Sequence, residues 1–372
     1  MSPGCMTASS PIFIINVKSL DGFMDAEGRA LDVTKYAQEV VTLDELVRLL
    51  DTEKRPRAYI GFEPSGFLHI GSLLVPSKTI GAMLDNGFEV TVFLADWHAF
   101  INDKLGGNMD NIKACGEYMA DAFSFIAGSR QGLRFAFASE MISHSDYWTD
   151  LIKNAKHATL QRLKRAMTIM GRSEDEADLD SSKLLYPLMQ VTDIFRLGVD
   201  VAYAGMDQRR AHMLAREVAE SMGRKKPIAL HTPLLSSLKS TGRMDATESK
   251  MSKSDPSSAI YVHDDEATIS SKLKNAFCPK EIEGNPVLDI CRYIIFPYSG
   301  KLGIERSPKY GGHISFDSYN ALSEAYSRNE LHPLDLKAGV ASALWHITKP
   351  LHEHYVKKPE LLSWMSNATI TR

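Results

Sequence analysis

The stretch AYIGFEPSGFLHIGS, residues 58–72, decides the fold class of the chain. Its first residues form a short apolar run that predicts a strand, and a glycine-containing turn then leads into an apolar segment that predicts a helix. Glycines at such a turn let a ligand approach the backbone, and the N-terminus of a helix attracts anions. His69 would add a hydrogen-bond donor at the same end. The stretch therefore predicts a phosphate-binding turn; a tight turn around a structural histidine is the alternative.

Three further strands are predicted downstream, at residues 89–95, 133–138 and 199–204, with helical patterns between them. In residues 110–127, for example, apolar side chains recur on one helical face. Strands that alternate with helices of this length favour a parallel sheet, so we expect an α/β fold.

The two ends of the chain lack the alternating strand and helix patterns of the middle. Residues 1–30 show little periodicity, and a helical pattern begins at Asp32, with Thr42 and Glu45 predicting another helix start. After about residue 262 the pattern is helical, with Pro and Gly between segments at 267–277, 286–295, 318–327 and 335–347. We therefore predict an N-terminal extension (1–31), an α/β domain (32–255) and a smaller, mainly helical domain (256–372).

Composition excludes several classes of protein. The 372 residues are 44% hydrophobic and 24% charged, the mixture of an ordinary globular protein. The net charge of −3 excludes a bulk-basic nucleic-acid binder but allows a local basic patch. Four distant cysteines without a CxxC pair exclude a disulfide scaffold and a zinc ribbon, and they suit a reducing cytosol. The apolar runs are too short for a membrane span, and we expect no signal peptide.

A second motif lies far downstream, in the string KMSKS at residues 250–254. Lys250 and Lys253, flanked by small hydroxyl residues, suit a mobile loop that neutralises polyphosphate charge in a transition state. A solvated surface loop is the alternative for any isolated pair of lysines. The full string is much rarer than that pair, and the HIGS stretch at 69–72 precedes it at the end of a predicted strand. The two motifs together favour a nucleotide site.

The pair resembles the HIGH and KMSKS signatures of the class I aminoacyl-tRNA synthetases. Over roughly residues 32–355, the chain is similar to the tyrosyl branch of that family, archaeal and eukaryotic type, through the strings YIGFEPSG, FLADWHA, YPLMQVTDI, GMDQRRAHMLARE, CPKEIEGNPVL, KYGG and LHPLDLK. Two departures stand out. Ser72 replaces the last histidine of HIGH, and residues 1–30 have no recognised counterpart.

The resemblance implies a Rossmann-like catalytic domain followed by a helical anticodon-binding domain. It implies ATP-dependent attachment of L-tyrosine to tRNA(Tyr) through a tyrosyl-adenylate, with Mg²⁺ arriving on ATP. It also implies a cytoplasmic homodimer. We expect no dedicated metal site, no membrane and no DNA as partners.

The tyrosine site is expected on the helix that contains YPLMQVTD. Tyr186, Gln190 and Asp193 stand at i, i+4 and i+7, which is one helical face, although a polar solvent-facing side has the same spacing. By resemblance, Tyr186 and Gln190 hold the α-amino group, and Asp193 with Tyr59 holds the phenol. Gln208 also matches a substrate contact. A site that hydrogen-bonds the substrate hydroxyl can discriminate against phenylalanine by a factor of about 10⁴–10⁵, and tyrosyl-tRNA synthetases are the known example of this discrimination. The resemblance therefore implies that no editing domain is needed.

The ATP site is expected around the two motifs. The residues that the resemblance assigns to catalysis are His69, Ser72, Lys250 and Lys253. Asp207, after the predicted strand at 199–204, matches a contact to the ATP ribose, and a turn-forming aspartate is its alternative. The glycines of the ATP site are Gly61, Gly71 and Gly205.

Candidate RNA surfaces occur in both halves of the chain. Residues 151–172 hold six basic residues and no acidic one, which describes either a solvated helix face or a phosphate-binding surface. By resemblance, Arg165 and Arg209 read the first acceptor base pair. Tyr310, His332 and Asp335 match an anticodon pocket in which planar rings stack on a base and a carboxylate accepts from guanine. Without the resemblance, Tyr310 would be a core residue and His332 a helix-start residue.

Two rival functions remain at this point. A tryptophanyl enzyme shares the architecture, but Tyr59 with Asp193 suits a hydroxyl rather than an indole. A catalytically retired paralogue that binds RNA is disfavoured because His69 and both motif lysines are retained.

Overall fold

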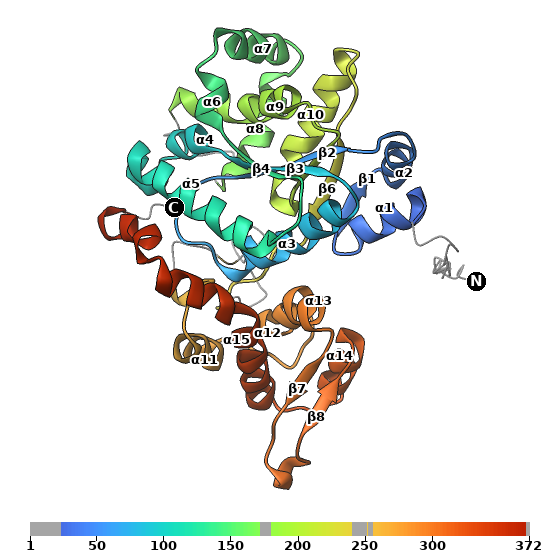
Figure 1. The fold of residues 1–372 in the computed structure, drawn as a ribbon, viewed down its shortest axis with the longest axis vertical. Helices are drawn as coiled ribbons and strands as arrows, with labels where there is room; N and C mark the ends of the chain where they lie inside the picture. The colour runs from blue at the N-terminus through green and yellow to red at the C-terminus, as the bar shows by residue number, and fades with distance from the viewer. Residues whose placement is uncertain (1–23, 172–179, 240–250, 252–255, 370–372) are drawn as a thin grey trace, which may run out of the picture.

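The computed structural model describes residues 24–171, 180–239, 251 and 256–369. Its centre is a six-stranded sheet in the order β1-β6-β5-β2-β3-β4, in which only β1 is antiparallel to its neighbour (Figure 1). The strands are β1 Glu39–Val41, β2 Arg57–Phe62, β3 Glu89–Leu94, β4 Leu133–Phe137, β5 Val201–Gly205 and β6 Ile228–Thr232. The four predicted strands are confirmed, as is the α/β class. The order reverses between β2 and β5, which is where sheets of this kind bind ligands.

Helices cover both faces of the sheet. On one face lie α3 Ile70–Asp85 and α5 Met109–Ala127; on the other lie α9 Leu185–Leu197 and α10 Arg209–Ser221 (Figure 1). Successive side chains of a strand point to opposite faces, and in β2 the side chain of Tyr59 packs in a different core cluster from those of Ala58 and Ile60. The shorter helices are α4 Asp96–Ile101, α6 Ala138–Ile142, α7 Ser145–Ala155 and α8 Leu160–Ala166. Helices α7 and α8 pack against α9, and α4 contacts both α5 and α9.

The N-terminal boundary differs from the prediction. Helix α1, Ala26–Thr34, begins inside the segment assigned to the extension, and its Ala30 and Val33 are completely buried. It packs beside α2, Leu43–Thr52. The predicted helix start at Thr42 is confirmed as a capping box with Glu45. Part of the segment that sequence patterns left unassigned is thus a core helix. The part of the helix inside that segment, residues 26–31, makes fewer than two turns, so it has too few apolar residues to show a periodic pattern.

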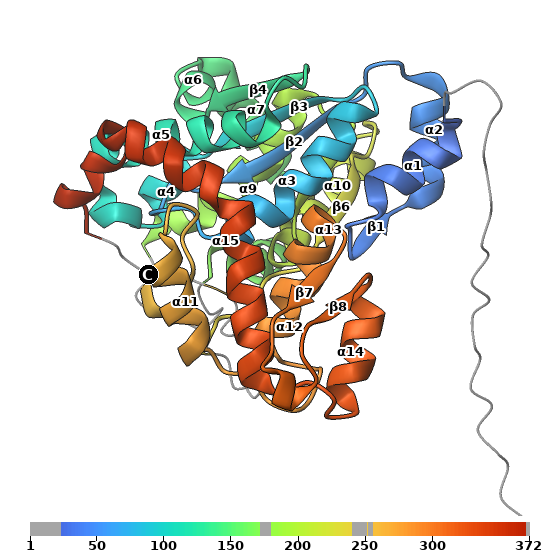
Figure 2. The same cartoon turned by 60° about the horizontal axis from the view of Figure 1, so that its bottom comes forward.

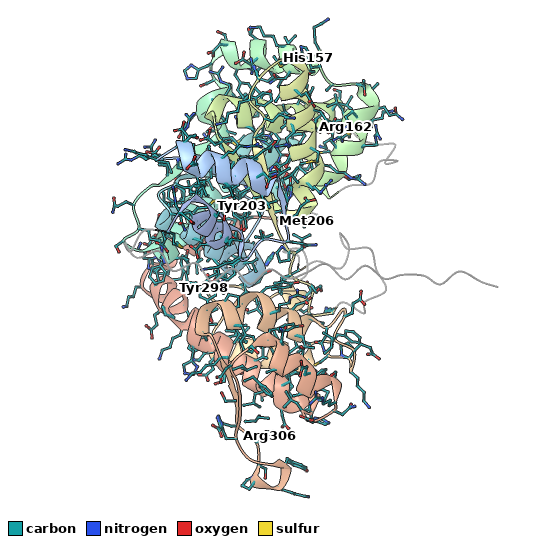
Figure 3. The ribbon with its side chains drawn as sticks, turned by 90° about the vertical axis from the view of Figure 1, so that its right-hand side faces the viewer. His157, Arg162, Tyr203, Met206, Tyr298 and Arg306 are labelled. Carbon is teal, nitrogen blue, oxygen red and sulfur yellow. The ribbon has the colours of Figure 1, made fainter. Side chains whose placement is uncertain are left out.

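The C-terminal part is mainly helical, as predicted, but it also contains a hairpin (Figure 2). Its strands, β7 Leu302–Ile304 and β8 Ile314–Phe316, are antiparallel. They were not predicted, because three residues are too few to show alternation. The tip of this hairpin, marked by Arg306, lies at the opposite end of the molecule from His157 and Arg162 (Figure 3). The helices are α11 Glu266–Asn275, α12 Pro286–Ile290 continued by a π-helical turn, α13 Phe296–Ser299, α14 Tyr319–Ser327 and α15 Pro333–Lys357.

The last helix returns to the sheet domain. Asp121 of α5 accepts hydrogen bonds from His354 Nε2 at 2.5 Å and from Lys358 Nζ at 2.8 Å. The C-terminal residues therefore pack against the sheet domain, although the predicted division assigns them to the second domain. The predicted division at residue 255 remains a prediction. Within the described ranges, no helix combines the length and the apolar character needed to cross a membrane.

Candidate active site

The N-terminus of α3 stands at the carboxyl end of β2, and His69 is its N-cap. His69 Nδ1 accepts from the backbone N–H of Ser72 at 3.2 Å. In return, Ser72 Oγ accepts from the backbone N–H of His69 at 3.0 Å, which completes a capping box. The departure from HIGH at residue 72 therefore has a structural role: the hydroxyl fixes the start of the helix. The predicted phosphate end of α3 is well ordered by these two residues.

Two predicted ATP-site glycines lie where a side chain would collide. A Cβ at Gly71 would come within 2.9 Å of Leu235 Cβ and 3.2 Å of the His69 ring. A Cβ at Gly205 would lie 2.8 Å from Asp207 Oδ1 and 2.8 Å from Leu234. Gly61, by contrast, would meet Tyr59 only at 3.6 Å, an ordinary contact. Gly71 and Gly205 thus allow the side chains of Leu235, Asp207 and Leu234 to pack closely against the backbone at the carboxyl edge of the sheet.

The segment around the second motif is only partly described, and Lys250 and Lys253 lie outside the described residues. Met251 is buried, and its backbone N–H donates to Leu235 O at 2.8 Å. Downstream, Ile70 N donates to Ile260 O at 2.9 Å and Val262 N donates to Leu68 O at 3.1 Å. The chain that leaves the KMSKS string is therefore hydrogen-bonded to the backbone of the HIGS turn.

The predicted tyrosine residues of α9 do share one face, and it faces the interior. Tyr186 Oη donates to Glu63 Oε1 at 2.5 Å, and Gln190 Nε2 donates to Gln208 Oε1 at 3.4 Å. Asp193 Oδ1 accepts from Tyr147 Oη at 2.8 Å. The solvent-facing alternative is wrong, because Tyr186 and Asp193 are only 5% and 1% exposed.

Two oxygens of this face have no hydrogen-bond partner within the described part of the chain: Asp193 Oδ2 and Gln190 Oε1. His98 Nε2 lies 3.2 Å from Asp193 Oδ2, but the contact does not have the geometry of a hydrogen bond. Burial raises the pKa of Asp193 to about 8 and lowers the pKa of His98 to about 3. At neutral pH both side chains are therefore uncharged. Buried polar atoms left without partners are uncommon, and here they point to a polar ligand.

Tyr59, on β2, lies beside the same face of α9, close to Gln190 and Asp193. It is 2% exposed, and its ring packs edge-on against Phe93. Its hydroxyl lies 3.4 Å from His212 Nε2, and burial raises its pKa. The structure thus brings Tyr59, Gln190 and Asp193 to one place from β2 and α9, the elements on which they were predicted.

The turn after β5 completes the carboxyl edge. Gly205, Asp207 and Gln208 follow one another there, and Gln208 Nε2 donates to Ile169 O at 3.1 Å. Gln208 therefore links the face of α9 to this turn. Asp207 lies beside Gly205, where the sheet order reverses.

Three pocket residues were not predicted as site residues. Glu63 and His98 stand inside the quoted strings YIGFEPSG and FLADWHA, so their position directly after a strand was an available signal. Tyr147 had none: it reaches Asp193 from α7, a separate helix, and no local pattern indicates that contact.

The basic residues near α8 are partly committed to protein contacts. Arg162 pairs with Glu217 through Nε at 2.7 Å. Arg165 is exposed, and its carbonyl accepts from Arg210. Arg209 pairs with Glu39 through Nε at 2.8 Å. Among the described residues, no hydrogen bond joins Arg165 to Arg209, and their RNA role remains a prediction.

The predicted anticodon residues lie in the C-terminal part. Tyr310, in the loop between β7 and β8, is 63% exposed, so its core alternative is wrong. His332 is the N-cap of α15 and its Nδ1 accepts from Leu334 N at 3.2 Å. It is therefore a helix-start residue whose ring is still exposed. Asp335 lies in the first turn of the same helix.

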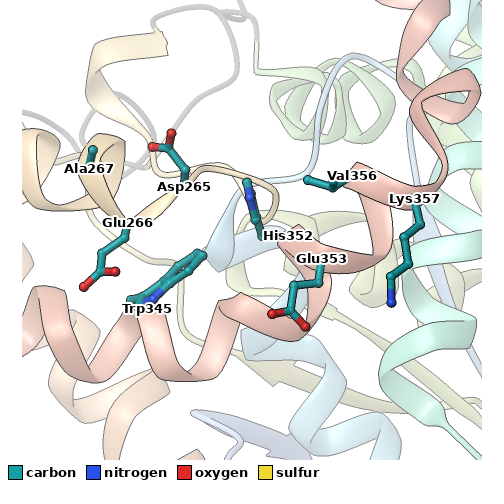
Figure 4. A pocket seen from close by; sticks show the side chains of 8 residues that line it. All are labelled: Asp265, Glu266, Ala267, Trp345, His352, Glu353, Val356 and Lys357. Atoms are coloured by element: carbon teal, nitrogen blue, oxygen red, sulfur yellow. The ribbon is translucent and has the colours of Figure 1, made fainter.

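Two surface hollows lie apart from these residues. One, of about 480 Å³, lies between the start of α11 and α15 and is lined by Trp345, His352 and Val356 among others (Figure 4). The other, also of about 480 Å³, includes Ser257 and Lys272. Neither is lined by a predicted site residue, so the candidate site rests on the carboxyl edge of the sheet.

Comparison with known proteins agrees with this geometry. The family model of the class I tRNA synthetases (W and Y) matches residues 51–348. A tyrosine--tRNA ligase from Picrophilus torridus is 50% identical, over 86% of this chain and 97% of its own. Crystal structures of tyrosyl-tRNA synthetases from Aeropyrum pernix (41% identity, TM-score 0.83, covering 92% of this chain and 98% of that one) and, complexed with L-tyrosine, from Pyrococcus horikoshii (39%, 0.86, 92% and 100%) have the same fold. The chain belongs to the class I tRNA synthetases of the tryptophan and tyrosine family, in the archaeal tyrosyl branch.

Proposed function

We propose that this chain attaches L-tyrosine to tRNA(Tyr) at the expense of ATP, through a tyrosyl-adenylate. The observation that carries the proposal is the buried polar face of α9, where Asp193 Oδ2 and Gln190 Oε1 have no hydrogen-bond partner within the described residues. A hydroxyl group, which can accept a hydrogen bond from the protonated carboxyl of Asp193, and an ammonium group, which can donate to Gln190 Oε1, would supply them if both belong to one amino acid. The tyrosine complex of the Pyrococcus horikoshii relative supports the same ligand.

In the proposed first step, a carboxylate oxygen of tyrosine bonds to the α-phosphorus of ATP, and the bond from that phosphorus to the bridging oxygen breaks, releasing pyrophosphate. In the second step, a ribose hydroxyl at the 3′ end of the tRNA attacks the carbonyl carbon, and AMP leaves. No protein nucleophile takes part. The enzyme acts by positioning its substrates and by stabilising phosphate charge.

Individual roles follow from position and resemblance. His69, Ser72, Lys250 and Lys253 are assigned to catalysis, and Mg²⁺ is assigned to the phosphates of ATP. The residues assigned to ATP binding are Gly61, His69, Gly71, Ser72, Gly205, Asp207, Lys250 and Lys253. Tyr186 and Gln190 are assigned to the α-amino group of tyrosine, Tyr59 with Asp193 to its phenol, and Gln208 to a further contact with the substrate.

The proposal extends to partners and organisation. Arg165 and Arg209 would contact the acceptor end of tRNA, and Tyr310, His332 and Asp335 its anticodon. Residues 32–255 would form the catalytic domain and 256–372 the anticodon domain. We also propose that the protein is a homodimer and that it acts in the cytoplasm, where translation consumes charged tRNA.

The test is ATP–pyrophosphate exchange with tyrosine, phenylalanine and tryptophan offered separately. The wild-type protein should respond to tyrosine, and Asp193→Ala should lose the preference over phenylalanine by orders of magnitude while remaining folded. Exchange with tryptophan would support the rival enzyme, and no exchange with any amino acid would support the retired paralogue. A persistent preference in the variant would show that the phenol is bound elsewhere.

A further inference from the structure

A chain of buried hydrogen-bonding groups leads from the candidate phenol site to the edge of the sheet. Tyr59 Oη lies 3.4 Å from His212 Nε2. His212 Nδ1 lies 3.1 Å from His231 Nε2. His231 Nδ1 lies 2.9 Å from Glu39 Oε2. The chain connects β2, α10, β6 and β1, and each ring nitrogen of both histidines is used in it.

Gln190 also hydrogen-bonds to Tyr59, in the sense of a donor to its oxygen, and burial leaves these groups few other partners. Tyr59 is 2% exposed, and His212 and His231 are completely buried. The two imidazole rings are inclined by only 26°. His231 stands directly opposite Glu39 in the pairing of β6 with β1, which holds that end of the chain by backbone geometry.

The far end of the chain fixes its direction. Glu39 also pairs with Arg209 Nε, at 2.8 and 3.0 Å, so its carboxylate acts only as an acceptor. His231 Nδ1 must therefore donate to it. Burial lowers the pKa of His231 and His212, so each neutral ring has one N–H and one bare nitrogen.

The remaining hydrogens follow in order. Because Nδ1 of His231 donates, its Nε2 accepts, and the partner on His212 must be the Nδ1–H. His212 Nε2 is then bare and accepts the hydroxyl hydrogen of Tyr59. Tautomers are assigned in this way from the network that surrounds them.

We propose that His212 and His231 are positioning residues that hold the hydroxyl hydrogen of Tyr59 away from the pocket, so that Tyr59 presents only lone pairs to the ligand. The inference rests on the proposed function, in which Tyr59 faces the phenol. A ligand group at that point must then donate a hydrogen. Tyrosine does so, whereas an isostere without that hydrogen leaves the ligand-facing lone pair of Tyr59 without a donor.

The activity test compares tyrosine with 4-fluorophenylalanine, which is close to tyrosine in size and has no hydrogen to donate at that position. The measured quantity is the ratio of kcat/KM for the two in pyrophosphate exchange. In His212→Leu the hydroxyl of Tyr59 is free to turn, and we expect the ratio to fall about three- to tenfold, as for the loss of one neutral hydrogen bond. His212→Gln, which keeps an acceptor and a donor, should retain most of the ratio.

Matched variants separate this effect from general damage. His263→Leu removes another largely buried histidine outside the chain and should leave the ratio unchanged. In a Tyr59→Phe background, His212→Leu should have no further effect, because the hydroxyl it positions is gone. An unchanged ratio in folded His212→Leu would overturn the inference. A wild-type protein without preference for tyrosine would instead count against the proposed function.

A second measurement needs neither activity nor a stable leucine variant. In wild-type protein labelled with ¹⁵N-histidine, the imidazole nitrogen shifts distinguish the two neutral tautomers, and His212→Gln and His231→Gln variants assign the signals. Both residues should carry hydrogen on Nδ1. An Nε2–H form, or a doubly protonated ring, at either residue near neutral pH would overturn the inference whatever the substrate proves to be.

Discussion

At the scale of the residue, Asp193 shows how burial alone changes chemistry. One of its oxygens is held by Tyr147 and the other lies beside an uncharged His98. Burial raises the pKa of Asp193 from 3.8 to about 8, so the folded protein keeps a proton that the unfolded chain releases. Between these two values the folded state binds more protons than the unfolded state. The stabilisation is complete below the lower value and is lost as pH rises through the upper one.

Replacing this acid with its neutral isostere should remove the effect. Asp193→Asn mimics the protonated carboxyl group, so its melting temperature relative to wild type should rise between pH 6 and pH 8 and then level off. Thermal unfolding in matched buffers measures the difference. Asp51→Asn, at an exposed position in α2, serves as the control and should follow the wild-type profile. Parallel profiles for wild type and Asp193→Asn would contradict the buried, protonated state.

The same residues show what sequence could supply. Tyr186, Gln190 and Asp193 could be placed together because helical spacing is a local property. The contacts of Asp193 with Tyr147 and His98 join separate helices, and those of His212 with Tyr59 and His231 join a helix to two strands. Such contacts depend on how elements pack, so the surroundings that set the pKa of Asp193 and the direction of the Tyr59 hydroxyl required the structure.

At the scale of the element, the start of α3 combines a cap with a close approach. His69 and Ser72 cap the helix mutually, and Gly71 lies against Leu235, whose carbonyl bonds to Met251. The strand-turn-helix reading of this region is confirmed, because glycines and an apolar run are strong local signals. The strands β1 and β6 were missed: β1 has only three residues, and the five residues of β6 are all buried and show no alternation.

Two glycines of α3 should respond oppositely to alanine. At Gly71 the added Cβ meets Leu235 at 2.9 Å, and we expect a loss of about 1–3 kcal/mol in the free energy of unfolding. At Gly81 the nearest atom lies at 3.7 Å, and the gain in helix propensity should stabilise the protein by about 0.5–1 kcal/mol. Urea unfolding of both variants measures the difference. A Gly71→Ala variant as stable as Gly81→Ala would show that the turn has room.

At the scale of the whole molecule, the predicted functions lie at separate ends. Those predicted tyrosine and ATP residues that the structure describes gather at the carboxyl edge of the six-stranded sheet, whereas Tyr310 lies in the hairpin and His332 and Asp335 lie at the start of α15. Figure 2 shows the hairpin and α15 below the sheet domain. The two-part organisation could be predicted because the alternating strand and helix pattern gives way to a helical pattern after the second motif. The return of α15 to α5 could not, because it depends on contacts between residues far apart in sequence.

This separation predicts a selective defect. Asp335→Ala should leave pyrophosphate exchange nearly unchanged and weaken tRNA charging by about 1–3 kcal/mol in kcat/KM, the range for one specific base-edge contact. The loss should be smaller on a tRNA altered at the guanine that this residue is proposed to read. Asp317→Ala, exposed in the same part of the molecule, is the control. Equal losses on both tRNAs would make Asp335 a helix-start residue only, and loss of exchange would contradict the division of labour.

The length of helix α15 sets the distance between Asp335 and the contact of this helix with the sheet domain. It has 25 residues, so it is about 37 Å long at roughly 1.5 Å per residue. Its first turn holds Asp335, and its last residues reach Asp121 of the sheet domain. The number of residues in the helix therefore fixes the spacing between Asp335 and Asp121. One residue inserted near its middle would lengthen the helix by about 1.5 Å and rotate one end against the other by about 100°. This spacing should therefore be disturbed less by substitutions in the helix than by insertions or deletions.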